Sequence, residues 1–353
     1  MGSSPTSGTS TTKPAHCAGF LFVPGQVDAG GCLGRVDSDL CFARAEHQTI
    51  SVFVIGCYEL VLVASDMGHQ LRELAMRYTT DQLYELQSAL EDRTKKLQAL
   101  QGDCLRAASG ERELVIEYMS HGVGRRLSIL RHAITTIFSE FPPSTTSILE
   151  RNALMRVQIN LQAFFINLIG VFDNWAWSYV YLHSAEATVG GKHGVDMFKE
   201  ATQRILPAEL SLYLGSTQTK DWHSRYLKNY RDALAHRIPL YIPPSTLTQK
   251  EREDLDQLEK QRYDSILRYD FDKADKLKSE ADTIGSPCFY FLHSFSEENA
   301  PRPIMIHPQV LSDAETVVEF GNLFLANWRT APTTGPRVTD GIRPVSNAAV
   351  CQR

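Results

Sequence analysis

Four polar residues lie close together near the end of a helix that the sequence predicts for residues 220 to 237. Asn229, Asp232 and His236 follow at intervals of three and four residues, so the helical repeat makes them neighbours. A carboxylate beside an imidazole fixes the tautomer of the ring and favours its protonated form, and the negative end of the helix dipole acts in the same direction. Arg231 adds a planar guanidinium that suits phosphate. A base near neutrality, an orienting carboxylate and a phosphate-binding group are the parts needed to cleave RNA through its own 2′-hydroxyl.

The arrangement Arg231-Asp232-x-x-x-His236 resembles the signature of the HEPN family, in which an arginine, usually followed by a polar residue, precedes a histidine by several positions. The resemblance covers residues 111 to 244 best and extends to the last predicted helix. It implies a mainly α fold, an antiparallel helical bundle. It also implies the activity of the family's metal-independent endoribonucleases, which belong to toxin–antitoxin and phage-defence systems. Other members of the family lack that activity.

The resemblance further implies a role for each residue of the site. His236 would be the general base that takes the proton of a ribose 2′-hydroxyl, Arg231 would bind the scissile phosphate, and Asp232 would orient His236. Asn229 and Arg237 would contact the substrate. Two protomers of a HEPN enzyme usually join their motifs in one cleft, so we expect a homodimer, an RNA substrate, and no metal or other cofactor. In a toxin–antitoxin context an antitoxin protein would be a further partner.

Other interpretations of the same residues stay open. A non-catalytic HEPN-like module would bind RNA, a nucleotide or a protein without cutting a strand. A plain helical scaffold would dock a partner through a charged arm. An exposed Asp–His pair near a helix end is also an ordinary surface feature that contributes about 0.3 kcal/mol.

Arginine–histidine pairs at a similar spacing occur twice more in the chain. Arg302-x4-His307 falls in a segment that the sequence predicts to be a strand. Arg126-x5-His132 falls in a predicted helix, but the apolar Leu127 follows its arginine. The pair that begins at residue 231 is the one that combines a polar neighbour, a helical setting and a long apolar helix upstream, and we therefore place the candidate site there.

Composition narrows the class of protein. The net charge of −5 over 353 residues excludes a protein that coats nucleic acid through a basic surface. Seven cysteines without a Cys-x-x-Cys pair indicate free thiols in a reducing compartment, and no secretory signal is visible, so we expect a cytoplasmic protein. Residues 163 to 182 are apolar enough to span a membrane. They contain Asp173 and Asn174, however, which favour a buried bundle helix and no membrane.

Capping signals and apolar spacing predict the helices of the bundle. Thr79-Thr80-Asp81-Gln82 forms a capping box ahead of a helix, and Ser147-x-x-Glu150 precedes the longest apolar stretch. Gly122 and Gly124 predict a break within one helix, which ends before Pro142. The predicted helices after the first run over residues 111 to 138, 148 to 183, 195 to 205, 220 to 237 and 312 to 328.

The remaining patterns divide the chain into five regions. Residues 248 to 282 are more than half charged yet keep an apolar stripe, which predicts one long helix or a helical hairpin inserted into the bundle. Residues 50 to 55, 60 to 63, 289 to 292 and 304 to 306 predict a minor β element. The composition before Met67 also suggests the hypothesis that Met67 is the native start. The regions are an N-terminal stretch, partly disordered (1–66), the helical bundle with the HEPN-like motif (67–247), the charged helical insertion (248–283), a return segment with the last bundle helix (284–330) and a disordered tail (331–353).

Overall fold

A computed structural model describes residues 50–55, 59–64, 78–292 and 303–332 of the chain. All of them belong to one compact unit, Ser38–Arg353. The N-terminal stretch of residues 1–66, expected to be partly disordered, lies outside the described residues except for 50–55 and 59–64. The tail of residues 331–353, expected to be disordered, lies outside them from residue 333, as does the hypothesis that Met67 is the native start.

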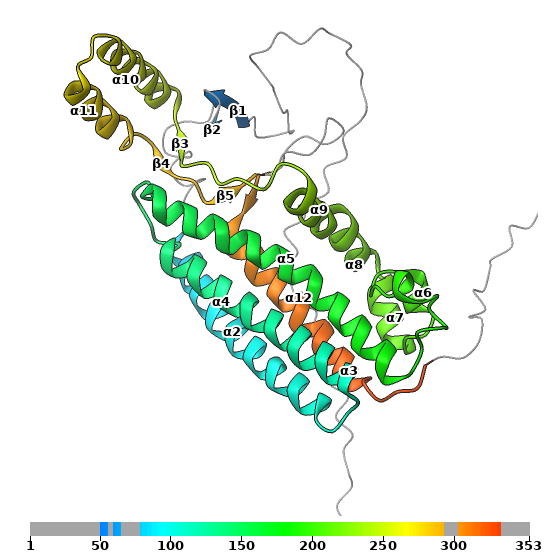
Figure 1. The fold of residues 1–353 in the computed structure, drawn as a ribbon. Helices are drawn as coiled ribbons and strands as arrows, with labels where there is room; N and C mark the ends of the chain where they lie inside the picture. The colour runs from blue at the N-terminus through cyan, green and yellow to red at the C-terminus, as the bar shows by residue number, and fades with distance from the viewer. Residues whose placement is uncertain (1–49, 56–58, 65–77, 293–302, 333–353) are drawn as a thin grey trace, which may run out of the picture. The chain divides into compact units, whose positions relative to one another are not determined.

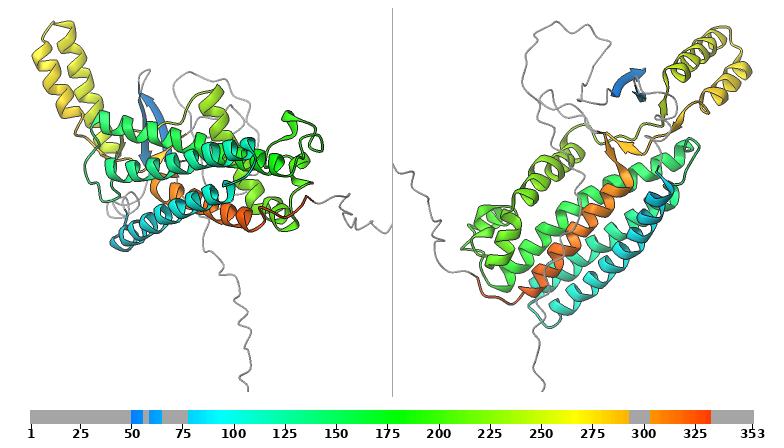
Figure 2. Two further views of the ribbon diagram at one scale, coloured as in Figure 1. Left: turned by 60° about the horizontal axis from the view of Figure 1, so that its bottom comes forward. Right: turned by 180° about the vertical axis from the view of Figure 1, so that it is seen from behind.

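Four long helices pack side by side in the described part of the chain and form a bundle (Figure 1, Figure 2). They are α2 (Thr80–Ala108), α4 (Gly124–Glu140), α5 (Arg151–Leu182) and α12 (Ile306–Ala326). The predicted capping box begins α2, since the Thr79 backbone N donates to Gln82 Oε1 at 2.9 Å and Gln82 N donates to Thr79 Oγ1 at 3.3 Å. The prediction of a mainly α fold, a helical bundle, is confirmed.

The predicted break near Gly122 and Gly124 is wrong. There, α3 (Glu113–Ile116), the π-helical segment η2 (Glu117–Val123) and α4 follow one another without interruption. The Gly124 N–H bonds to the carbonyl of Met119, five residues back. This turn therefore holds one residue more than an α-helical turn, and the helix continues without a break.

Helix α5 lies at the centre of the core and is, by length and hydropathy, the described helix that could cross a membrane. It begins at Arg151, three residues later than predicted, because Glu150 and not Ser147 caps it by accepting from Ala153 N at 3.2 Å. Its aromatic residues pack against α12, with the rings of Phe172 and Trp175 at 4.9 and 5.4 Å from that of Phe320. Each such buried side chain contributes about 2 kcal/mol to folding.

Helix α12 begins at Ile306, six residues before the predicted start at Ser312. Pro308 lies in its first turn, where proline is tolerated because that backbone N–H has no partner in a helix. His307 and Asp313 are therefore residues of the helix and are buried in the core.

A further helical run carries the candidate site. It consists of α8 (Thr217–Asp221), the π-helical segment η4 (Trp222–Leu227) and α9 (Lys228–His236), which confirms the predicted helix at residues 220 to 237 and extends it by three residues at its start. The elements that connect α5 to this run are η3 (Lys192–Gly194), α6 (Glu200–Gln203) and α7 (Ala208–Gly215).

The minor β element is larger than predicted. A four-stranded sheet has the order β1 (Ile50–Ile55), β2 (Glu59–Ala64), β3 (Ser245–Leu247) and β4 (Ser286–Pro287), with β2 and β3 parallel and the other pairs antiparallel. The predicted strands in residues 289 to 292 and 304 to 306 form the antiparallel pair β5 (Tyr290–Phe291) and β6 (Ile304–Met305). Of the two alternatives predicted for the charged insertion, one long helix or a helical hairpin, the structure has the hairpin. In it, α10 (Gln249–Leu267) packs on α11 (Phe271–Ala281) (Figure 1).

Candidate functional site

The inner side of the η4–α9 run is held in the core by a buried carboxylate on α12. Trp222 Nε1 donates to Asp313 Oδ1 at 2.8 Å and the Tyr226 hydroxyl donates to Asp313 Oδ2 at 2.7 Å. Burial raises the pKa of Asp313 to about 6, although these hydrogen bonds oppose the shift. One turn further along, the ring of Tyr230 stacks on that of Phe165 in α5 with centroids 4.8 Å apart. The direction in which α9 points its outer residues is thus fixed by packing.

The outer side of α9 carries the predicted site residues. Arg231 and Asp232 are half-buried and His236 is exposed in the last turn, as predicted. Arg231 Nη1 lies 3.1 Å from Asp232 Oδ1, and the His236 imidazole makes no hydrogen bond with any residue that the structure describes. The predicted hydrogen bond from Asp232 to His236 is therefore absent, because the carboxylate pairs with the neighbouring guanidinium instead.

Asn229 and Arg237, the two residues predicted to contact the substrate, differ in whether their side chains are already hydrogen-bonded. Asn229 Nδ2 donates to the carbonyl of Arg225 at 2.9 Å, so its amide nitrogen is engaged by its own helix. Arg237 is exposed just after the helix, where the backbone turns extended with φ −134° and ψ −154°. Arg237 can therefore reach a ligand beside His236, whereas Asn229 offers only its amide oxygen.

Comparisons of the chain with family models, with curated proteins and with solved structures found no match. What the site can do must therefore be judged from its own side chains.

Two further ionisable residues lie beside Arg231 and were not predicted. Burial raises the pKa of Asp173, on α5, to about 6, and the charge of Asp196 raises it further while Arg231 lowers it. His223, on η4, stacks on Phe198 with ring centroids 3.6 Å apart, and burial lowers its pKa to about 4. In the sequence, Asp173 and Asn174 stand inside the apolar stretch of α5, and polar residues in such a stretch are the signal that points to a polar site on this helix.

The competing histidine at residue 307 occupies a different environment. The predicted strand before it is present as β6 (Ile304–Met305), His307 itself lies in the first turn of α12, and Arg302 lies outside the described residues. His307 Nε2 donates to the carbonyl of Phe141 at 2.6 Å, and Nδ1 accepts from the Tyr78 hydroxyl at 3.2 Å. Burial lowers the pKa of His307 to about 4. Both ring nitrogens of His307 form hydrogen bonds inside the core, so neither is free to act as a general base.

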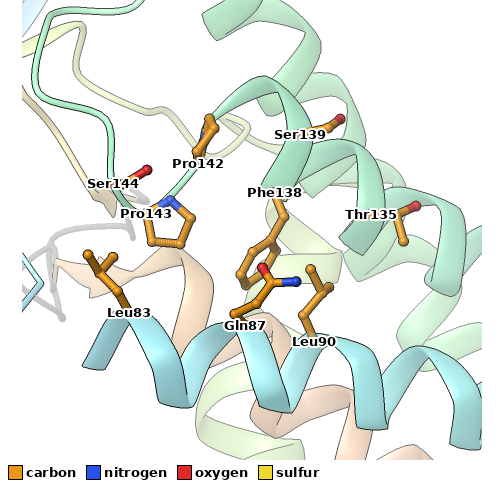
Figure 3. Close-up of a pocket in the computed structure, with 9 residues that line it drawn as sticks. All are labelled: Leu83, Gln87, Leu90, Thr135, Phe138, Ser139, Pro142, Pro143 and Ser144. Atoms are coloured by element: carbon orange, nitrogen blue, oxygen red, sulfur yellow. The ribbon is translucent and has the colours of Figure 1, made fainter. Parts of the chain in front are cut away.

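A cavity of about 320 Å³ lies between α2, α4 and the loop that follows α4 (Figure 3). Apolar, hydroxyl and amide side chains surround it, and no acidic, basic or histidine side chain does: Leu83, Gln87, Leu90, Thr135, Phe138, Ser139, Pro142, Pro143 and Ser144. None of the predicted site residues reaches it. Among the described residues there is also no group of three or more His, Cys, Asp and Glu side chains that could hold a metal ion.

Proposed function

We propose that this chain is a metal-independent endoribonuclease of the HEPN type, with Arg231 and His236 as its catalytic residues. The observation that carries the proposal is the free imidazole of His236, five residues after a half-buried arginine on a helix whose inner side is locked into the core. A general base must reach a substrate proton without first giving up another bond, and His236 meets that requirement.

The reaction follows from these two side chains. His236 takes the proton of a ribose 2′-hydroxyl, the 2′-oxygen attacks the adjacent phosphorus, and the bond to the 5′-oxygen breaks. Arg231 binds the phosphate oxygens and stabilises their growing negative charge. The departing 5′-oxygen takes a proton from water. The products are a 2′,3′-cyclic phosphate and a 5′-hydroxyl, and DNA is inert because deoxyribose lacks the nucleophile.

In this scheme Asp232 positions the guanidinium and not the imidazole. Its 3.1 Å contact with Arg231 Nη1 leaves Nε and Nη2 of that arginine for phosphate. Arg237 supplies a second, exposed positive charge after the helix.

An exposed apolar stripe runs along α5. Met155, Ile159 and Ile166 lie on one side of that helix and are 50%, 56% and 38% exposed. Apolar side chains gathered on one face, on the helix against which α9 packs, are typical of a protein interface. We propose that this stripe joins two protomers and brings two Arg–His motifs into one cleft. Sedimentation analysis checks it: Ile159→Glu converts a dimer to a monomer, and a wild-type monomer would contradict it.

The catalytic proposal is tested by incubating RNA with the full-length protein in EDTA. We expect cleavage with cyclic phosphate ends, and its loss in Arg231→Ala and in His236→Ala. Matched controls are Arg225→Ala, an exposed arginine on the same helical run, and His132→Ala, an exposed histidine on α4. Cleavage that survives both site variants would overturn the assignment. RNA binding without scission would instead favour the non-catalytic HEPN-like module. The cytoplasmic location and an antitoxin partner stay predictions.

A further inference from the structure

One arginine of α4, Arg126, reaches across to α5, the helix against which α9 packs. Arg126 Nε donates to Asn174 Oδ1 at 2.7 Å, and its Nη1 donates to Asn167 Oδ1 at 3.2 Å. Both asparagines belong to the helix that also carries Asp173. The guanidinium is therefore held in a fixed orientation by two side chains one helical repeat of seven apart.

Two glycines make room for this arrangement. A Cβ atom at Gly170 would overlap the guanidinium of Arg126, and one at Gly122 would lie 2.8 Å from Asn174 Cγ. Gly122 belongs to the π-helical segment η2, and such segments often occur at functional sites. The close approach of the two helices thus depends on the absence of side chains where the polar groups meet.

Within the part of the chain that the structure describes, no carboxylate pairs directly with the charge of Arg126. Its two hydrogen bonds go to neutral amide oxygens, and its Nη2 bonds to no residue that the structure describes. A guanidinium keeps its proton at any physiological pH. A half-buried positive charge with a free N–H group can therefore bind an anion without breaking an existing ion pair.

Arg126 and Arg231 act on the same carboxylate. Asp173 is also influenced by Asp196 and Lys199, so four charged side chains surround it. Two of them, the guanidinium groups, come from α4 and from α9 on either side of α5. Arg126 bonds to Asn174, the residue after Asp173, and α9 packs on the same helix, so both guanidinium groups border one stretch of α5 although 105 positions separate them in sequence.

We propose that Arg126 is a second phosphate-binding group of the same RNA site and binds a phosphate beside the scissile one. The proposal rests on the proposed endoribonuclease function. Neutral amides orient Arg126, and its guanidinium group and that of Arg231 bind two phosphates of one strand. Contacts of this kind set the register of the strand and carry no base specificity.

The experiment measures binding of a fluorescent 2′-O-methyl RNA oligonucleotide, which has no free nucleophile and stays intact. We expect Arg126→Gln to weaken binding about tenfold and to reduce the slope of log K against log salt concentration by about 0.7, the value of one phosphate contact in single strands. Arg125→Gln is the matched control, because Arg125 is exposed on the same helix and its guanidinium bonds to the exposed His121. It should leave both quantities unchanged.

Two more variants keep the test valid if Arg126→Gln folds poorly. Gly170→Ala displaces the guanidinium without removing it and should weaken binding, while Asp173→Asn removes a negative charge and should tighten it. Unchanged binding in Arg126→Gln and Gly170→Ala, beside a wild type that binds and cleaves RNA, would overturn this inference alone. A wild-type protein that neither binds nor cleaves RNA would overturn the proposed function and the inference with it.

Discussion

His236 and His307 each follow an arginine by five residues, yet they lie in opposite environments. The imidazole of His236 is exposed and bonds to no described residue. That of His307 is fully buried, with one nitrogen donating to the carbonyl of Phe141 and the other accepting from Tyr78. The same spacing therefore places an unbonded imidazole at the end of α9 and a buried, hydrogen-bonded imidazole in α12. A motif predicts chemistry only where the fold leaves its side chains unengaged.

The largest expected effects come from replacing each of these two histidines by alanine. His236→Ala should lower RNA cleavage by about 10²- to 10⁴-fold, because it removes the general base, and should leave thermal unfolding unchanged. His307→Ala should lower the free energy of unfolding and leave cleavage by the folded protein unchanged. It leaves the Phe141 carbonyl and the Tyr78 hydroxyl without their partner, which costs about 3 kcal/mol of unfolding free energy. A folded His307→Ala protein that has lost cleavage would break the comparison.

The next effect concerns pH and the two buried groups of α12. The pKa of His307 is lowered from 6.5 to about 4, so its contribution to stability is present above pH 6.5 and is lost as pH falls toward 4. The pKa of Asp313 is raised from 3.8 to about 6, so its contribution is present below pH 3.8 and is lost as pH rises through 6. Each change amounts to about 3 kcal/mol, and the two oppose each other between pH 4 and 6.

Urea unfolding at pH 4, 5, 6 and 7 separates these contributions. Relative to the wild type, His307→Gln should lose stability as pH rises, and Asp313→Asn should gain it. Parallel pH profiles for the wild type and both variants would show that neither group changes its protonation on unfolding.

The smallest effect is expected at Asp232. Because its carboxylate bonds to Arg231 and not to His236, Asp232→Asn should reduce cleavage by less than about tenfold, and the pH at which the rate is half-maximal should stay in place. A residue that oriented the imidazole would shift that midpoint when removed. Measuring kcat against pH for this variant distinguishes the two roles, and a shifted midpoint would restore the orienting role that the sequence predicts.

Local signals in the sequence predict much of the fold. The capping box at Thr79, the hairpin in the charged insertion and the helix that carries Arg231 are set by residues close to one another in the chain. The start of α12 is predicted six residues too late, at Ser312, although Pro308 fits a first helical turn. In the same way, Ser147 resembles a cap that Glu150 provides.

The sequence predicts only the part of the candidate site that lies on one helix, α9. Arg231, Asp232 and His236 share α9, so their neighbourhood follows from spacing alone. The bonds from Arg126 to Asn167 and Asn174 join residues 41 and 48 positions apart, and only tertiary packing brings them together. The pairing of Asp232 with its neighbour instead of with His236 is likewise a choice between two partners within reach, which spacing does not decide.

The π-helical segment η4 makes the helical run before α9 tolerant of a change in its length. Lys228 N–H bonds five residues back, to the carbonyl of His223, so this turn holds one residue more than an α-helical turn. Removal of a single residue within it, such as Ser224, would let the turn close as an ordinary α-helix, and the side chains of α9 would keep their direction around the helix axis. Removal of a residue from a regular α-helical turn would instead rotate everything after it by about 100°. The wide turn therefore absorbs a difference of one residue that would otherwise rotate Arg231 around the axis.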